Sequence, residues 1–595
     1  MLASAALLAF AATAVPPISA PVSHIRYDVS FTRELASRHH LGVSMAFDVT
    51  GSGDVLLSLP AWTPGAYEMG WFSRWVSGFT ATTDGKPLKW DKLDYDTWRI
   101  RPAGARQIQV DFQYQADSLD NAMAWSRNDF AFFNGTNVFL YPEGRSPDFP
   151  ATVRVHTEAD WRVATGMRPG AERDSFGEKS YHDLVDMPFF VGRFDIDSAQ
   201  VAGVNARLAT YPAGQLSGQA RTAFWDQYRR MFAPEAGTFG ETPFAAYTTF
   251  MVFDSGFGGG SALEHQNSHL GIYTPEGIGQ LWVASITAHE MFHAWNVKRL
   301  RPAEMVPYRY DVPEPTPWLW VSEGITDYYA DVVLTRGAVM DSAGFLAATT
   351  EKILTVGNTV PVSLQDASLS TWVHPTDGTE YTYYPKGSLA GFLLDILIRD
   401  ASDNRRSLDQ VMQELYRTTY KAGKGFGATE WWGAVRRAAG GRDFAWFNER
   451  YIDGREPFPW DSVLPLAGLS LVTDTIRIPR FGIETQADSS GARVTNVAPD
   501  GAGAAAGIHP GDVILQLADI PVAGEESFNQ FRTRYATREG ESVPIRIRRG
   551  NQELTLTATI RLGVVTSDRI ELDPNASPKA VRIRHGLFAG VTGSG

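Results

Sequence analysis

Short alternating runs of apolar and polar residues characterise the first third of the chain and indicate β structure. Between about Pro21 and Ala199 these runs span only a few positions, as in Val55–Leu59 and Ile108–Phe112, and Gly and Pro residues separate them. A period of two residues is typical of strands that bury one face. The pattern therefore predicts an N-terminal β domain over residues 21–199.

Beyond about Val201 the pattern changes to apolar spacings of three and four residues, and it stays helical to about Pro459. We expect helices in Thr222–Phe232, Gly277–Lys298, Glu323–Arg336, Lys386–Asp400, Ser407–Tyr416 and Thr429–Ala439. This part is the largest and the richest in aromatic residues. We therefore place a mainly helical domain at residues 200–470 and expect the chemistry there.

A third unit begins near Pro479 and combines short strands with two short helical patterns. The order of these elements, together with the run Ala505-Ala506-Gly507-Ile508-His509-Pro510-Gly511-Asp512-Val513-Ile514, resembles a PDZ domain. We place this domain at residues 479–565. Residues 566–595 carry no pattern that predicts an element, so we expect a C-terminal tail.

The PDZ resemblance implies one candidate binding site. An extended peptide could add to the domain as a strand, and the backbone N–H groups around Phe481, Gly482 and Ile483 would then hold its terminal carboxylate. The same unit could instead serve as a packing domain whose groove is covered. The sequence leaves both possibilities open.

The first twenty residues differ from the rest of the chain. Leu2–Val15 is an uninterrupted run of small and apolar residues, followed by Pro16-Pro17 and then by Ile18-Ser19-Ala20. The run is too short to cross a bilayer, which takes about 20 residues. It has the form of a secretory signal at residues 1–20, cleaved after Ala20. We expect an exported protein, periplasmic or extracellular, with no membrane span.

Composition narrows the classes of function. Hydrophobic residues make up 44% of the chain and charged residues 20%, which is typical of globular proteins. The formal net charge is −13 and no basic tract is present, so we expect no nucleic-acid partner, because phosphates bind clustered cations. The absence of cysteine excludes disulfides and thiolate ligands. Any metal must therefore be held by His, Asp and Glu.

A candidate metal site lies in His289-Glu290-Met291-Phe292-His293, which fits the HExxH pattern. In a helix, His289 and His293 lie one turn apart on the same face. Each can then present a ring nitrogen to one Zn²⁺ at about 2.0–2.1 Å. Glu290 is adjacent, where it can take a proton from a water at the metal, and is the candidate catalytic base.

A catalytic zinc needs a third protein ligand and an open position. Glu323 lies in the first turn of the next strong helical pattern and is the candidate third ligand, which gives one zinc per chain. Asp327 lies four residues later on the same face. There its carboxylate could accept the N–H of a ligand histidine and thereby set that ring's tautomer.

With these residues the chain resembles the glycyl aminopeptidase family, a group of exported zinc peptidases that carry a PDZ domain. The resemblance rests on His289–Arg299 and Trp320–Tyr329, and more weakly on Trp62–Tyr67 and Phe133–Thr136. It covers most of residues 24–565. It implies a multidomain α+β protein with an N-terminal β-sandwich, a thermolysin-like and mainly helical catalytic domain, and a C-terminal PDZ domain.

The resemblance also implies two residues that would touch substrate. Glu264 matches a strand-edge glutamate that binds the substrate's α-amine in relatives, although here two extra residues precede Leu263 and the edge could be bulged. Tyr384 matches a tyrosine in a Tyr-x-Lys-Gly motif, and its hydroxyl would donate to the oxyanion formed during hydrolysis. Tyr381 and Tyr383 stand close by and compete for this role.

Three functions compete at this point. The first is a zinc aminopeptidase acting on peptides with a free N-terminus, with a preference for Gly or Ala that only the family implies. The second is an endopeptidase acting on chains that the PDZ unit delivers. Glu264 disfavours this function, because an endopeptidase does not need a carboxylate that binds the substrate's amine. The third, a PDZ binding protein with an inactive site, is disfavoured because His289, Glu290, His293 and Glu323 are all present.

Overall fold

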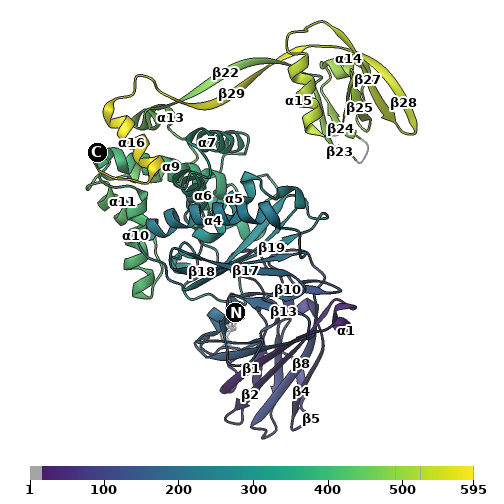
Figure 1. Ribbon diagram of the computed structural model, residues 1–595, viewed down its shortest axis with the longest axis vertical. Helices are drawn as coiled ribbons and strands as arrows, with labels where there is room; N and C mark the ends of the chain where they lie inside the picture. The colour runs from purple at the N-terminus through teal and green to yellow at the C-terminus, as the bar shows by residue number, and fades with distance from the viewer. Residues whose placement is uncertain (1–16, 489–490, 523, 594–595) are drawn as a thin grey trace, which may run out of the picture. The chain divides into compact units, whose positions relative to one another are not determined.

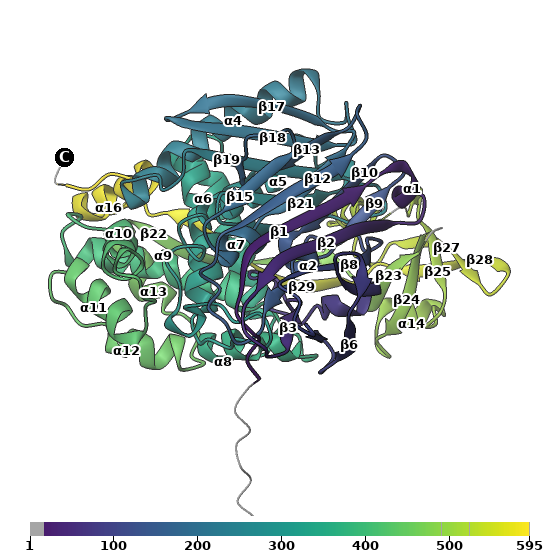
Figure 2. The same cartoon turned by 90° about the horizontal axis from the view of Figure 1, so that it is seen from below.

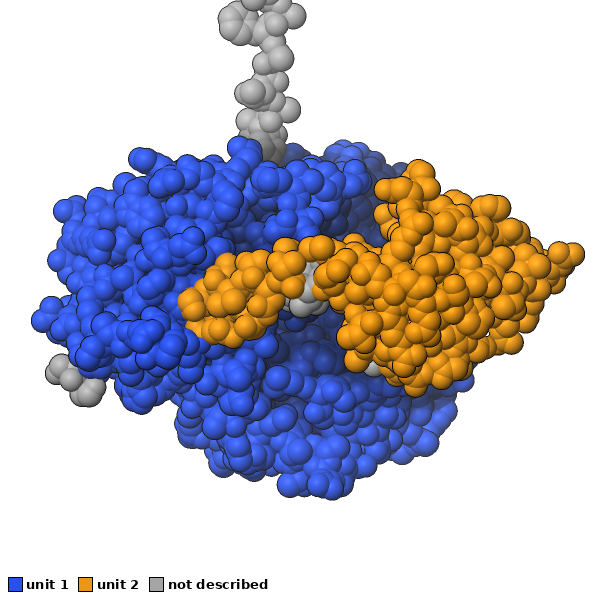
Figure 3. Space-filling view, turned by 90° about the horizontal axis from the view of Figure 1, so that it is seen from above, with its two compact units in different colours: residues 1–469, 572–595 blue, residues 470–571 orange. Residues whose placement is uncertain are grey.

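The computed structural model describes residues 17–488, 491–522 and 524–593, so the apolar run Leu2–Val15 lies outside the described residues. Among the described residues, no helix is both long enough and apolar enough to cross a membrane. The chain forms two compact units (Figure 3). One contains the residues up to Leu469 together with those from Leu572 onward, and the other is Ser470–Glu571.

The N-terminal part of the first unit is rich in β structure (Figure 2). Its largest sheet has eight strands in the order β14-β15-β12-β1-β2-β8-β4-β5, in which only β1 and β12 pair in parallel. These strands are β1 (Val22–Phe31), β2 (His40–Val49), β4 (Val76–Thr83), β5 (Lys86–Pro87), β8 (Gln107–Gln115), β12 (Ala151–Thr157), β14 (Arg168–Pro169) and β15 (Ser175–Glu178). Strand β2 alternates buried and half-buried residues, as the sequence pattern predicts.

Two four-stranded sheets complete this part, with the orders β13-β16-β10-β9 and β11-β3-β7-β6. Their strands are β3 (Val55–Ser58), β6 (Lys89–Lys92), β7 (Thr97–Arg101), β9 (Trp125–Arg127), β10 (Phe130–Asn134), β11 (Tyr141–Pro142), β13 (Arg162–Thr165) and β16 (Pro188–Gly192). Three short helices interrupt them, namely α1 (Arg33–Ala36), α2 (Gly135–Val138) and α3 (Tyr181–Val185).

A five-stranded sheet of order β17-β18-β19-β21-β20 follows. Its strands are β17 (Asp195–Val201), β18 (Val204–Tyr211), β19 (Ala246–Phe253), β20 (Gly260–His265) and β21 (Ser268–Tyr273). The three central strands run parallel, and both edge strands are antiparallel to their neighbours. The sheet begins at Asp195, slightly before the domain boundary that we place at residue 200.

A shared aromatic core joins this sheet to the N-terminal part. Buried side chains of β9, β10 and β16 pack against those of β19 and β21, and the rings of Phe190 and Phe250 lie 4.8 Å apart. In Figure 1 the sheet lies between the N-terminal strands and the helices. Because burial of apolar surface stabilises by roughly 25 cal/mol per Å², this core explains why the two parts form one compact unit.

The helical part of the first unit matches the predicted segments. Its main helices are α4 (Gly218–Phe239), α5 (Leu281–Phe292), α6 (Ile325–Arg336), α7 (Ser342–Gly357), α8 (Leu364–Ser370), α9 (Tyr383–Ala401), α10 (Leu408–Thr418) and α11 (Ala428–Ala438). The helix predicted over Gly277–Lys298 is shorter, because Gln280 is its N-cap and the chain leaves the helix after His293. A turn of π-helix, Trp320–Gly324, precedes α6.

The second unit has the strand order of the predicted PDZ domain, with the sheet β23-β24-β25-β27-β28 and the short strand β26 paired to β25. Its elements are β23 (Ile483–Asp488), β24 (Gly491–Val497), α14 (Ala502–Ala506), β25 (Val513–Leu517), β26 (Ile520–Pro521), α15 (Glu525–Arg534), β27 (Ser542–Arg549) and β28 (Gln552–Thr559). A two-stranded ribbon, β22 (Leu469–Pro479) and β29 (Leu562–Leu572), leads into and out of it.

The expectation of a tail without elements at residues 566–595 is wrong. Strand β29 continues to Leu572, and helix α16 (Pro578–Ala589) is part of the first unit, where it packs against α6 and α9. The buried Arg399 donates a hydrogen bond to Val591 O at 2.9 Å. Basic residues separate the few apolar positions of α16, so its periodicity is too weak to predict a helix. Tertiary packing, in which Ile583 is buried, stabilises the helix instead.

Candidate active site

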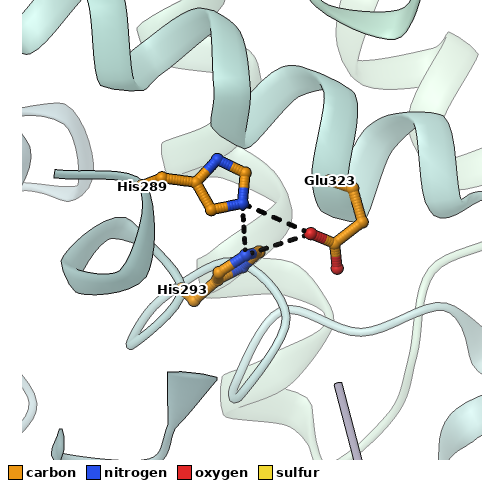
Figure 4. A group of neighbouring side chains, drawn as sticks. All are labelled: His289, His293 and Glu323. Carbon is orange, nitrogen blue, oxygen red and sulfur yellow. Dashed lines mark hydrogen bonds and ion pairs between the residues drawn. The ribbon is translucent and has the colours of Figure 1, made fainter. Parts of the chain in front are cut away.

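The structure brings the three candidate metal ligands together (Figure 4). His289 lies in the last turn of α5, His293 ends that helix, and Glu323 comes from the π-helical turn before α6. The distances are 2.9 Å between the two Nε2 atoms, 3.4 Å from His289 Nε2 to Glu323 Oε2, and 3.1 Å from His293 Nε2 to the same oxygen. Tetrahedral ligands at zinc distances lie about 3.3 Å apart. The donor set therefore fits a divalent cation such as zinc.

Two glycines let the Glu323 turn approach helix α9. A Cβ atom on Gly324 would lie 2.5 Å from Gly387 Cα, and one on Gly387 would lie 2.8 Å from Trp320 O. Neither position has room for a larger residue without a backbone shift. This close crossing brings the start of α9, which carries Tyr384, next to the Glu323 turn.

A backbone carbonyl sets the tautomer of His293. Its Nδ1 lies 2.7 Å from Asn296 O, and because a carbonyl only accepts, Nδ1 carries the hydrogen and Nε2 stays free for a metal. The side chain of Asn296 donates to Val321 O at 2.9 Å and to Thr326 Oγ1 at 3.0 Å, which ties the end of α5 to the Glu323 segment. Sequence reasoning missed Asn296, although it lies within the HExxH-containing run.

Asp327 does not make the hydrogen bond that we expected. Its Oδ1 lies 4.0 Å from His289 Nδ1, beyond hydrogen-bonding range. The reason is Lys352, whose Nζ lies 2.7 Å from Asp327 Oδ2 and also 2.7 Å from Asp331 Oδ2. Asp327 does face the correct ring nitrogen, so a supporting role for it stays a prediction.

Glu290 lies beside the ligand triangle and is buried, with 5% of its surface exposed. One carboxylate oxygen, Oε2, has no hydrogen-bond partner among the described residues. Burial, together with the neighbouring carboxylates of Glu264 and Glu323, raises the pKa of Glu290. A divalent cation among the ligands would oppose this shift, because its charge favours the ionised carboxylate. An ionised Glu290 at this position is suited to accept a proton.

Glu264 lies on the edge strand β20, which pairs with β21 over its full length from Gly260 to His265. The two extra residues therefore extend the strand and do not form the bulge that we considered. The Glu264 carboxylate is buried, and Lys298 Nζ lies 3.8 Å from its Oε1. Lys298 is closer to Asp186, at 2.9 Å. Burial raises the pKa of Glu264, and Lys298 opposes that shift.

The three candidate tyrosines differ clearly in their surroundings. The ring of Tyr384 lies 5.9 Å from the ring of His289. The hydroxyl of Tyr383 is 3.1 Å from Thr371 Oγ1, and Tyr381 is 47% exposed. Tyr384 lies in the first turn of α9, which begins earlier than predicted. Its ring contact with a candidate ligand makes Tyr384 the best placed of the three for the predicted role.

The candidate carboxylate loop of the second unit borders a groove of about 490 Å³. Its lining includes Phe481, Gly482 and Ile483, together with Phe528 and Phe531 of α15. Strand β23, which Ile483 begins, is the edge strand of its sheet. An edge strand beside a groove is the arrangement that strand addition of a peptide requires.

Known families match three regions of the chain. The model for the Peptidase M61 N-terminal domain matches residues 26–193, that for M61 glycyl aminopeptidase matches residues 282–390, and that for the PDZ domain matches residues 479–560. Two of these models describe the N-terminal and catalytic domains of M61 peptidases, so the chain carries both domains of the M61 glycyl aminopeptidase family. The matched region 282–390 contains His289, Glu290, His293, Glu323 and Tyr384, whereas Glu264 lies outside it.

One solved structure confirms the fold of this chain. An aminopeptidase N family protein from Idiomarina loihiensis aligns with a TM-score of 0.79 at 24% identity, over 95% of this chain and 100% of that chain. An M1 zinc metallopeptidase from Deinococcus radiodurans aligns at 0.48 and 17% identity, over 75% of this chain and 96% of that chain. No curated protein matches the chain. The family matches and the His/Glu cluster indicate a metallo-aminopeptidase.

Proposed function

We propose that the protein is an exported, zinc-dependent aminopeptidase that removes N-terminal residues, with a preference for Gly or Ala, from peptides. Glu264 Oε1 is the observation that supports an aminopeptidase most directly. It is buried without a hydrogen-bond partner among the described residues, because the nearby Lys298 pairs more closely with Asp186. One atom each of Glu264, Glu290 and His293 lies within 4.8 Å of the others. A substrate ammonium bound to Glu264 would bring the first peptide bond beside the metal site.

The residues of the site have separate roles in hydrolysis. Zinc held by His289, His293 and Glu323 would supply Lewis-acid chemistry that acidifies a water and polarises the scissile carbonyl. Glu290 accepts the proton of the attacking water and delivers it to the leaving amine. Tyr384 donates a hydrogen bond to the developing oxyanion.

Glu264 has a complementary role in this mechanism. Its carboxylate binds the ammonium of the substrate, which selects peptides with a free N-terminus and sets the distance from that end to the cleaved bond. Holding the reacting groups in this geometry is itself a large part of catalysis.

Peptides with free and acetylated N-termini test this proposal. The wild-type protein should cleave free peptides one residue at a time and should cleave the acetylated peptides poorly. Glu264→Gln should lower kcat/KM for free peptides by about 30-fold to several thousand-fold, since loss of a charge pair in a partly dry site costs on the order of 2–5 kcal/mol. Its metal content should be unchanged.

Glu178→Gln is a matched control, because Glu178 is also a buried carboxylate but pairs with Arg168 in the N-terminal sheet. That variant should keep the wild-type preference for free peptides. If free and acetylated peptides are cleaved equally well at internal bonds, the aminopeptidase proposal is wrong and the protein is an endopeptidase.

The groove of the second unit supports a second role, the binding of peptide C-termini. The test uses the full chain carrying Glu290→Gln, so that the bound peptide is not degraded. Acetylated peptides with a free C-terminal carboxylate should bind roughly 10–100-fold more tightly than the same peptides with an amidated end, because charge-assisted hydrogen bonds contribute about 1.5–3 kcal/mol. Equal affinity would mean that the groove does not hold a carboxylate.

One finer point of the proposal, export, rests on the sequence alone. Export rests on the apolar run Leu2–Val15, and cell fractionation would contradict it by finding the mature protein in the cytoplasm. A binding protein without catalysis is the remaining alternative. It would bind C-terminal peptides and show neither stoichiometric metal nor hydrolysis.

A further inference from the structure

A turn of the N-terminal β domain reaches the candidate metal site. The hydroxyl of Tyr67 donates a hydrogen bond of 2.5 Å to Glu323 Oε1. The other carboxylate oxygen, Glu323 Oε2, faces His289 and His293. Both partners are buried, with 3% of Tyr67 and 2% of Glu323 exposed. The two oxygens of Glu323 are thus divided between the N-terminal domain and the candidate metal position.

We propose that Tyr67 is a positioning residue for the metal ligand Glu323. By occupying Oε1, it leaves only Oε2 for the metal and fixes the rotation of the carboxylate. The N-terminal β domain thereby completes the metal site. This inference rests on the metal site of the proposed function and adds to it a residue from outside the helical domain.

The chemistry of this contact suits that role. A phenol keeps its proton at neutral pH, since its ordinary pKa is about 10, and therefore remains a donor. An O–H group that donates to a carboxylate forms a short, strong hydrogen bond. Hydrogen bonds to a metal-ligating carboxylate orient it, and their loss typically costs about 10–100-fold in metal affinity or activity.

The turn that carries Tyr67 is held firmly against the helical domain. Ala61 N donates to Tyr310 O and the indole N–H of Trp62 donates to Arg309 O, each at 2.7 Å. Pro64 O accepts a hydrogen bond of 2.9 Å from the buried Nζ of Lys298. These contacts all come from the segment that follows α5, between Lys298 and Tyr310, so the turn that carries Tyr67 is tied to the helical domain at several points.

The backbone of the turn is also specialised for this approach. Gly65 has φ of +111° and Tyr67 has φ of 52°, a left-handed conformation that costs a non-glycine residue of order 1 kcal/mol or more. A Cβ atom on Gly65 would lie 2.4 Å from Glu264 Oε2. Only glycine lets the turn lie directly on the candidate amine-binding carboxylate. The turn thus contacts two site carboxylates, Glu264 through its backbone and Glu323 through Tyr67.

The variant Tyr67→Phe isolates the hydroxyl, because the ring and its contact with Trp372 are kept. Chelator competition should show metal affinity lower by about 10–100-fold. The visible absorption bands of the cobalt-substituted protein should shift, since the ligand field changes when Glu323 can rotate. For peptide cleavage by the zinc-loaded protein, kcat should fall while KM stays near the wild-type value.

Tyr310→Phe is the matched control. Tyr310 is buried in the same interface, and its hydroxyl lies 2.7 Å from His182 Nδ1 rather than beside a ligand. This variant should keep the metal affinity and the cobalt spectrum of the wild-type protein. If both variants lower metal affinity equally, the effect comes from the interface and the positioning role is overturned.

Two further outcomes would also overturn the inference. Unchanged metal affinity and cobalt spectrum in Tyr67→Phe would show that the hydroxyl does not position Glu323, and a simultaneous fall in kcat would assign Tyr67 to the substrate instead. Failure of the wild-type protein to bind metal would refute the proposed function itself. Normal wild-type binding with an unaffected variant refutes only the role of Tyr67.

Discussion

Replacing His293 with alanine should leave the protein without stoichiometric metal and without measurable peptidase activity. His293 Nε2 lies 2.9 Å and 3.1 Å from the two other candidate ligand atoms, so its removal opens the site on one side. Three protein ligands are the usual minimum for a catalytic zinc, and two bind it far more weakly. Metal analysis after dialysis should find about one zinc per wild-type chain and much less in the variant.

Metal restoration separates loss of the ligand from loss of the fold. Chelation should inactivate the wild-type protein, and added zinc should restore it, whereas zinc at the same concentration should not restore His293→Ala. His156→Ala serves as the control, because His156 is an exposed histidine that pairs with Asp28 on the N-terminal sheet. Stoichiometric zinc retained by His293→Ala would refute the ligand assignment.

Glu290→Gln should keep the metal and lose most of the activity. The amide cannot accept a proton, and general-base catalysis contributes typically about 10²–10⁴-fold. We therefore expect kcat to fall by roughly 10²–10⁴-fold with little change in KM. Metal content should stay at the wild-type level, because Glu290 lies outside the triangle of His289, His293 and Glu323.

The shorter carboxylate of Glu290→Asp provides a graded comparison. Aspartate keeps a carboxylate base, but its side chain is one methylene shorter, so the base lies farther from the attacking water. The activity of this variant should therefore lie between those of the wild-type protein and Glu290→Gln. If Glu290→Gln turns over peptides at the wild-type rate, another group is the base. Loss of metal in Glu290→Gln would instead identify Glu290 as a metal ligand rather than the catalytic base.

Local periodicity was sufficient for most of the fold. The apolar spacings in Thr222–Phe232 and Lys386–Asp400 predicted α4 and α9, because apolar residues that recur every three or four positions indicate a helix packed against a core. Helix α16 was missed for the opposite reason. Its buried positions Ala580, Ile583 and Leu587 stand among basic residues, and the helix depends on the surface against which it packs.

Some contacts of the candidate site were likewise predictable from local sequence and others were not. The spacing of His289 and His293 follows from helix geometry alone, so their convergence was predictable without a structure. The partner of Asp327 was not predictable. Lys352 lies on α7, and only the packing of that helix against α6 brings its ammonium close enough to draw Asp327 away from His289.

The sequence by itself determined the class of this protein: a β-rich N-terminal domain, an HExxH helix followed by a glutamate, and a PDZ unit. These are encoded in short-range patterns that fix backbone geometry over one or a few turns. Only the tertiary structure decided that Tyr67 holds Glu323, and that Lys298 pairs with Asp186 so that an oxygen of Glu264 stays without a partner. Those contacts join residues that are far apart in the chain, and their geometry depends on how whole domains pack, which local periodicity does not encode.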